Sequence, residues 1–148
     1  LVGVCDTDGK ALATAFENTC AKPFSNLSEM ISGSEADVVV LTTPSGLHPE
    51  QTIQLAKAGH HVRTEKPMAT LWQDGKLMVQ ACDEAAVRLF VVKQNRYNAT
   101  LQLLKKAIDQ GRFGRIYMVN INVFWTRPQE YYDSAAWRGT WELMGGPL

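Results

Sequence analysis

Lys66 is the side chain in this sequence best placed to take part in chemistry. It stands between Glu65 and Pro67, directly after a predicted strand at residues 61–64. Because proline stiffens the turn, we expect the lysine to be held firmly beyond the end of that strand. Its ammonium could hydrogen-bond a substrate hydroxyl and share the proton while hydride leaves the carbon. The alternative is a solvated surface lysine, which is the commoner fate of any one lysine.

Polar side chains also follow the other predicted strands of the first two thirds of the chain. In chain order, these groups are Asp6, then Thr43, Pro44 and Ser45, then Glu65 and Lys66, then residues 93–97. Ligands of open α/β sheets bind beyond the carboxyl ends of the strands. Four strands that deliver polar groups to one edge therefore favour a binding crevice there.

Asp6 has a specific chemical rationale. A carboxylate at the end of the second strand of a dinucleotide-binding fold accepts hydrogen bonds from the adenosine ribose hydroxyls and repels the 2′-phosphate of NADP. The alternative is a residue that forms an Asx turn, although Asp8 could take that part instead.

Strand and helix patterns alternate up to residue 92. The predicted strands are residues 1–5, 37–42, 61–64 and 88–92. The predicted long helices are residues 10–18, Pro49 to Gly59 and 70–86. A short helix with Leu27, Met30 and Ile31, capped by Ser25 or Asn26, is also predicted, and residues 22–24 are predicted to be an extended link. This alternation predicts βαβ units and a doubly wound, Rossmann-type parallel sheet of the α/β class. The unbroken apolar run at 37–42 predicts a strand covered on both faces.

The pattern changes after residue 92. Leu101, Leu104 and Ile108 predict a helix, and residues 116–125 alternate strictly, which predicts a long strand of an antiparallel or mixed sheet. We therefore divide the chain into a first domain at residues 1–94 and the start of an α+β domain at 95–148, and expect residues 126–148 to be irregular.

A glycine-rich strand-to-helix turn is absent from the sequence. The GxGxxG segment, whose backbone N–H groups hold a pyrophosphate, occurs nowhere in the chain, and residue 1 already lies in a predicted strand. In the usual strand order the missing strand is central, so we expect a gap in the sheet and a fragment of a longer protein.

Composition excludes several classes of protein. The 15 Lys and Arg balance 15 Asp and Glu, which argues against a nucleic-acid partner. No apolar run approaches the roughly 20 residues of a membrane span, so membrane insertion is not expected. No HExxH or CxxC spacing predicts a metal site, and no GxSxG elbow predicts a hydrolase. Cys5, Cys20 and Cys82 are interpreted as buried, unpaired residues of a cytoplasmic protein.

Several motifs together resemble the GFO/IDH/MocA oxidoreductase family. They are Thr42-Thr43-Pro44-Ser45, His48, Ala58-Gly59-His60-His61-Val62, Glu65-Lys66-Pro67, Gln94-Asn95-Arg96, Gly111-Arg112-Phe113-Gly114, Trp137-Arg138-Gly139 and Gly145-Gly146. The second half is similar to one branch of that family, the UDP-N-acetylglucosaminuronate 3-dehydrogenases of lipopolysaccharide O-antigen synthesis.

The resemblance implies a set of site residues and a reaction. Lys66 would be catalytic and Pro67 would follow a cis peptide, while NAD would contact Asp6, Thr43, Pro44, Ser45, His48, Glu65, Lys66, Trp137 and Arg138. The sugar nucleotide would contact Lys66, Asn95, Arg96 and Tyr132. The C3 hydroxyl of the sugar would be oxidised, its proton passing to Lys66 or to a histidine outside this chain.

Two alternatives remain open at this stage. One is a family member that acts on a free sugar or an inositol, and the other is a fragment without activity by itself. The resemblance also implies a homo-oligomer that forms through the sheet of the second domain.

Overall fold

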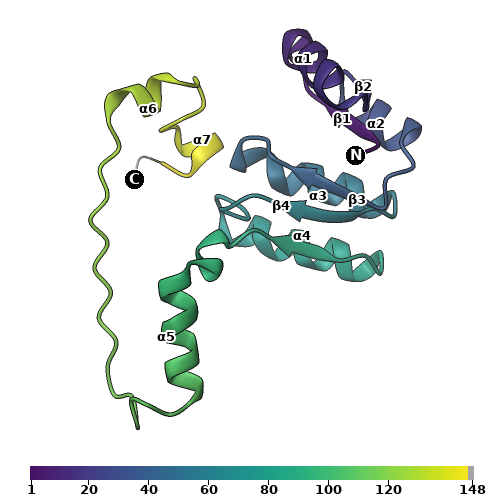
Figure 1. The fold of residues 1–148 in the computed structure, drawn as a ribbon. Coiled ribbons are helices and arrows are strands. Elements are labelled where there is room, and N and C mark those ends of the chain that lie inside the picture. The colour runs from purple at the N-terminus through teal and green to yellow at the C-terminus, as the bar shows by residue number, and fades with distance from the viewer. Residues whose placement is uncertain (147–148) are drawn as a thin grey trace.

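A three-stranded parallel sheet organises the first part of the molecule. In the computed structural model, which describes residues 1–146, strand β4 (His61–Thr64) lies between β3 (Val38–Leu41) and β5 (Leu89–Val91) (Figure 1). Both pairings are parallel, and each is linked by a helix. This arrangement confirms the predicted α/β class and Rossmann-type sheet.

A second, two-stranded parallel sheet precedes it. Strand β1 (Gly3–Cys5) pairs with β2 (Lys22–Phe24), so the predicted link at residues 22–24 is in fact a strand. Within residues 1–146, no strand joins this pair to β3 (Figure 1). The split lies in the middle of the sheet order, as the absence of a glycine-rich first unit predicts.

Helices α1 and α2 flank the small sheet, and local signals set their ends. In α1 (Gly9–Thr19), the first turn is capped by the carboxylate of Asp8, which accepts the Lys10 N–H at 2.8 Å. In α2 (Leu27–Gly33), Asn26 is the cap, because its side chain accepts the Glu29 N–H at 2.9 Å.

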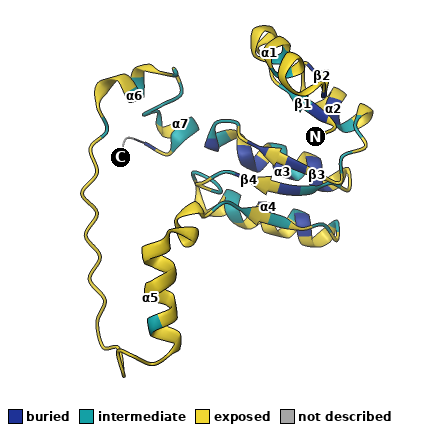
Figure 2. Ribbon diagram, in the orientation of Figure 1, coloured by how far each residue is buried: buried dark blue, intermediate teal, exposed yellow. Residues whose placement is uncertain are grey.

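Helices α3 (His48–Lys57) and α4 (Trp72–Glu84) cover one face of the three-stranded sheet. Pro49 occupies the first turn of α3, and Gly59 follows its end with a positive φ of 87°, as predicted from the sequence. The two helices pack against each other, and Leu55 on α3 and Met78 on α4 are completely buried. Figure 2 shows buried segments on the two helices and on the sheet beside them. Helices α3 and α4 thus support the strands whose ends carry the loops at residues 42–47 and 65–71.

The opposite face of the sheet is open in the described residues, which corrects one prediction. Val39 and Leu41 are buried, but Val38 and Val40 are 46% and 50% exposed. The expectation that this strand is covered on both faces is therefore wrong, because α3 and α4 both lie on the Leu41 side. An unbroken apolar run shows that both faces can be buried, but it does not supply the covering layer.

The second part of the chain is extended and exposed. After the short helix η2 (Gln94–Tyr97) comes α5 (Ala99–Asp109), followed by an extended stretch that leads to α6 (Gln129–Asp133) and α7 (Trp141–Met144) (Figures 1 and 2). The predicted strand at residues 116–125 is wrong as a paired strand, because these residues are extended but pair with no other strand in the described part. Alternation predicts the extended backbone, whereas a ladder also needs a partner. The region expected to be irregular contains two short helices, and its last two residues lie outside the described range.

The three cysteines are unpaired, as expected, but they differ in exposure. Cys82 is buried and Cys5 is half-buried, and burial raises the pKa of both thiols, with smaller contributions from the Asp83 and Asp6 carboxylates, respectively. Cys20 is exposed, so the prediction of burial is wrong for this residue. It occupies the C-cap of α1 with a positive φ of 54°.

Met78 provides a test of the helical layer. We expect Met78→Ala to lower the free energy of unfolding by about 2–5 kcal/mol, because the side chain is fully buried on α4, the helix that packs against α3. The neighbouring Leu77 is 50% exposed, and Leu77→Ala is the matched control with an expected loss below about 1 kcal/mol. Urea unfolding of the full-length protein measures both. Equal losses in the two variants would contradict the packing described here.

Candidate active site

Parallel register brings the ends of β3, β4 and β5 to one edge. Leu41 lies beside Thr64, and Thr64 lies beside Val91. The ladder continues one step further on both sides, because the Glu65 N–H donates to the Leu41 carbonyl at 3.0 Å and the Val92 N–H donates to the Thr64 carbonyl at 2.9 Å. The loops that follow these three strands therefore start side by side, as predicted. The fourth predicted strand, which precedes Asp6, lies in the separate β1–β2 sheet, so the prediction of one edge shared by four strands is wrong for this strand.

The loop after β4 carries Lys66. Its side chain is exposed beyond the strand, and the Lys66–Pro67 peptide bond is cis, as the family resemblance implied. The Glu65 carboxylate is half-buried and accepts the backbone N–H of Lys66 at 3.4 Å. The Glu65 side chain thus folds back on its own turn, while the Lys66 side chain is exposed to solvent.

The loop after β3 is held by contacts within the domain. The Thr43 hydroxyl donates to the Gln51 side-chain carbonyl on α3 at 2.6 Å. Pro44 precedes the short helix η1 (Ser45–Leu47), in which Ser45 is buried. Gln51 was missed by the sequence analysis, although its position one turn into α3 places it within reach of this loop.

His48 is completely buried beneath both loops. Its Nδ1 lies 3.1 Å from the Pro67 carbonyl, and its Nε2 lies 3.0 Å from the Thr43 carbonyl. Both ring nitrogens therefore face backbone of the two loops.

Asp6 lies at the end of β1, in the separate two-stranded sheet. Its side chain is exposed, and one carboxylate oxygen accepts the Asp8 N–H at 2.9 Å. Asp6 therefore forms the Asx turn, and Asp8 caps α1, so the two carboxylates have distinct local roles. The second carboxylate oxygen of Asp6 has no hydrogen bond within residues 1–146.

Asn95 and Arg96 follow β5 in η2. Both side chains are exposed, and their backbone carbonyls accept from Asn98 N–H and the Gln102 side chain. The structure thus keeps these two side chains on the surface just past the strand end.

Trp137 and Arg138 shortly precede α7, and it is α7 that contacts η1 in the loop after β3. Helix α7 packs on η1 so closely that a Cβ on Gly46 would lie 2.2 Å from the Glu142 carbonyl oxygen. Only a glycine permits this approach. Gly46 was not among the predicted site residues, although it directly follows Thr43, Pro44 and Ser45 in the sequence.

Arg138 is enclosed by aromatic rings. Its guanidinium lies 4.3 Å from the centre of the Tyr131 ring and 4.9 Å from that of Trp137. Tyr132 lies edge-on to Tyr131 at 5.3 Å and would contact a Cβ on Gly139 at 3.2 Å. Trp137, Arg138 and Tyr132 therefore lie in one cluster with Tyr131. Helix α7 begins three residues after Arg138.

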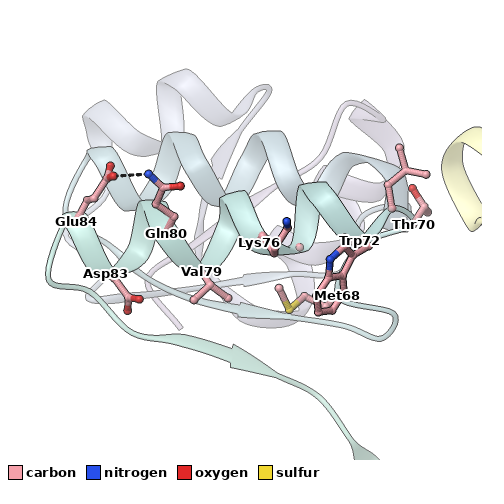
Figure 3. A pocket seen from close by; sticks show the side chains of 11 residues that line it. Met68, Thr70, Trp72, Lys76, Val79, Gln80, Asp83 and Glu84 are labelled. Carbon is pink, nitrogen blue, oxygen red and sulfur yellow. Dashed lines mark hydrogen bonds between the residues drawn. The ribbon is translucent and has the colours of Figure 1, made fainter.

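A groove begins at the far end of the loop after β4 and runs along α4. Its volume is about 870 Å³, and its walls include Met68, Trp72, Lys76 and Val79 (Figure 3). Its polar side chains do not come together at one point, because Gln80 and Glu84 are hydrogen-bonded to each other near one end of α4 and Lys76 lies further along the helix (Figure 3). A catalytic site needs convergent polar groups, so the strand ends remain the better candidate.

None of the helices in residues 1–146 combines the length and the apolarity needed to cross a membrane.

The fold and the strand-end loops define a Rossmann-type nucleotide-binding protein. Residues 1–93 match the oxidoreductase family with the NAD-binding Rossmann fold, GFO/IDH/MocA, and residues 101–148 match the C-terminal domain of the same family. The chain belongs to the GFO/IDH/MocA oxidoreductase family, which confirms the resemblance found in the sequence.

Two solved structures are similar over almost the whole chain. The WlbA dehydrogenase from Bordetella pertussis, in complex with NADH and UDP-GlcNAcA, is 69% identical with a TM-score of 0.93 and covers 97% of this chain and 44% of its own. The WlbA dehydrogenase from Chromobacterium violaceum, with the same two ligands, is 63% identical with a TM-score of 0.93 and covers 97% and 42%.

A more distant relative is the scyllo-inositol 2-dehydrogenase (NADP(+)) IolW of Bacillus subtilis. It is 36% identical over 114 residues, which are 76% of this chain and 30% of the relative. The chain thus spans about a third of the length of the curated relatives that it matches and less than half of the two WlbA chains.

Gly46 allows a test of the contact between α7 and the strand-end loop. We expect Gly46→Ala to destabilise this contact by about 1–3 kcal/mol, because the new methyl group would overlap the backbone of Glu142. Faster tryptic cleavage after Arg138 and a lower urea midpoint would report the loosening.

Gly9→Ala is the matched control, since nothing lies within 4 Å of a Cβ at that position. It should leave the cleavage rate unchanged. An unchanged cleavage rate in Gly46→Ala would contradict the docking of α7.

Proposed function

We propose that the protein oxidises the C3 hydroxyl of a UDP-N-acetylglucosaminuronate-type nucleotide sugar with NAD. The observation that carries the proposal is the match to two WlbA dehydrogenases, at 69% and 63% identity, whose structures hold NADH and UDP-GlcNAcA. The exposed Lys66 at the shared edge of three parallel strands supplies the chemistry on this chain's side.

The residues present fit one part of a bound NAD well. The carboxylate of Asp6 keeps one oxygen for a ribose hydroxyl and would repel the 2′-phosphate of NADP. The loop formed by Thr43, Pro44 and Ser45 and the turn of Glu65 and Lys66 start side by side at the sheet edge. The glycine-rich donors of a pyrophosphate site do not occur in this sequence.

The cofactor contacts follow from these positions. We assign them to Asp6, Thr43, Pro44, Ser45, Glu65 and Lys66, with Trp137 and Arg138 joining through α7. His48, buried under the same loops, acts on the cofactor through them.

Lys66 has the central role in the proposed reaction. When bound, NAD accepts the hydride that leaves the sugar carbon. A lone pair on the Lys66 Nζ accepts the hydrogen bond of the hydroxyl on that carbon and takes its proton, so that the C–O single bond becomes a carbonyl as the hydride leaves the carbon. The rigid turn around Lys66 supplies the positioning.

The sugar nucleotide would contact the exposed side chains past β5. We assign Asn95, Arg96 and Tyr132 to it, with the guanidinium of Arg96 suited to a carboxylate or phosphate. We further propose that residues 1–94 belong to the NAD-binding domain and residues 95–148 to the substrate domain. In this proposal the protein forms a homo-oligomer through the sheet of the second domain. It acts in the cytoplasm, in lipopolysaccharide O-antigen synthesis.

A single-turnover assay tests the reaction. The full-length protein is mixed with NAD and UDP-N-acetylglucosaminuronate, and NADH absorbance is followed. We expect Lys66→Ala to lower the rate about 10²- to 10⁴-fold, the range of general acid–base catalysis. Lys57→Ala, at an exposed lysine in the last turn of α3, is the control and should react like the wild type.

The outcomes separate the candidate substrates. NADH formed with scyllo-inositol or free sugars, but not with the UDP-sugar, would favour the activity of the inositol dehydrogenase relative. Wild-type turnover in Lys66→Ala would contradict the role of the lysine.

A further inference from the structure

Among residues 1–146, His48 is the one side chain with nitrogens at hydrogen-bond distance from both the β3 loop and the β4 loop. It is the first residue of α3 and is fully buried, with Nδ1 3.1 Å from the Pro67 carbonyl and Nε2 3.0 Å from the Thr43 carbonyl. Carbonyl oxygens only accept hydrogen bonds, so each contact requires an N–H on the ring. A neutral imidazole donates to one loop, and the imidazolium donates to both.

The two loops depend on His48 to different degrees. The Thr43 loop has a second tie to α3, because the Thr43 hydroxyl donates to Gln51 at 2.6 Å. In the described part of the chain, the loop at residues 66–70 has no second hydrogen bond to α3. Within residues 1–146, the bond from His48 to the Pro67 carbonyl is the only hydrogen bond that joins this loop to another element.

This asymmetry bears on Lys66, the residue immediately before Pro67. The β3–β4 ladder ends with the bond from Glu65 N–H to the Leu41 carbonyl, one residue before Lys66. From there on, the backbone around Lys66 is fixed to the domain through Pro67 and His48. A displacement of about 1 Å of a catalytic group can cost about 100-fold in rate.

We propose that His48 is a positioning residue, which holds Lys66 in place by donating from Nδ1 to the Pro67 carbonyl. The role rests on the proposed function, because it concerns the lysine assigned to the proton. The bond from Nε2 to Thr43 is secondary, since Gln51 also secures that loop.

Three substitutions separate the two ring nitrogens. The amide nitrogen of asparagine lies where Nδ1 lies, so His48→Asn keeps a donor for Pro67 and loses the one for Thr43. Glutamine places its amide nitrogen near Nε2, so His48→Gln keeps the donor for Thr43 and loses the one for Pro67. His48→Phe keeps the ring volume and removes both donors.

The expected pattern is a difference in kcat between the two amide variants. In the full-length protein, we expect His48→Gln and His48→Phe to lower kcat about 10- to 100-fold with UDP-N-acetylglucosaminuronate. We expect His48→Asn to stay within about threefold of the wild type. Melting temperatures of the Asn and Gln variants should be similar, which separates positioning from a general loss of stability.

Hydrogen exchange gives a readout that does not need turnover. Backbone amides of residues 65–69 should exchange faster in His48→Gln than in His48→Asn, and those of residues 42–45 should change little in either. If the wild type forms no NADH with any substrate, the proposed function fails, and this exchange pattern still tests the bond from His48.

Two results would overturn the inference. One is equal kcat values and equal exchange in the Asn and Gln variants, which would make His48 a general packing residue. The other is a folded His48→Phe variant with the turnover and exchange of the wild type.

Discussion

The parallel register of β3, β4 and β5 is the constraint on which the candidate site depends. Because Leu41, Thr64 and Val91 lie side by side, the loops after all three strands begin at one edge. Helices α3 and α4 pack on one face of the sheet and hold this register against a core that includes Leu55 and Met78. The polar groups thus converge through the geometry of a parallel sheet.

Two further contacts hold the neighbouring loops together and bring the second part of the chain against them. His48 connects the β3 and β4 loops from below. Gly46 lets α7 approach η1 from the second part of the chain. The first contact uses the two ring nitrogens of one histidine, and the second requires the absence of a Cβ. They join residues that are far apart in sequence, from Thr43 to Glu142.

Local patterns predicted most of the elements, and the misses have physical reasons. Caps, Pro49 and Gly59 bounded the helices, because those signals act within one turn. Local patterns could not predict the exposure of Val38 and Val40, because burial depends on a covering layer that is distant in sequence. They also could not predict that residues 116–125 lack a paired strand, because pairing depends on a distant partner. At the site, the strand-end loops were predicted from residue type, whereas Gln51 and Gly46 emerged only from tertiary contacts.

A crystal structure of the full-length protein with NADH and UDP-N-acetylglucosaminuronate is the most direct test of the role of Lys66. We expect the Lys66 Nζ to lie within hydrogen-bond reach, roughly 2.6–3.2 Å, of the sugar hydroxyl at C3. We also expect the nicotinamide to lie over the loops that follow β3 and β4. A sugar nucleotide bound elsewhere, for example in the groove along α4, or a Lys66 Nζ without contact to the substrate, would contradict this role.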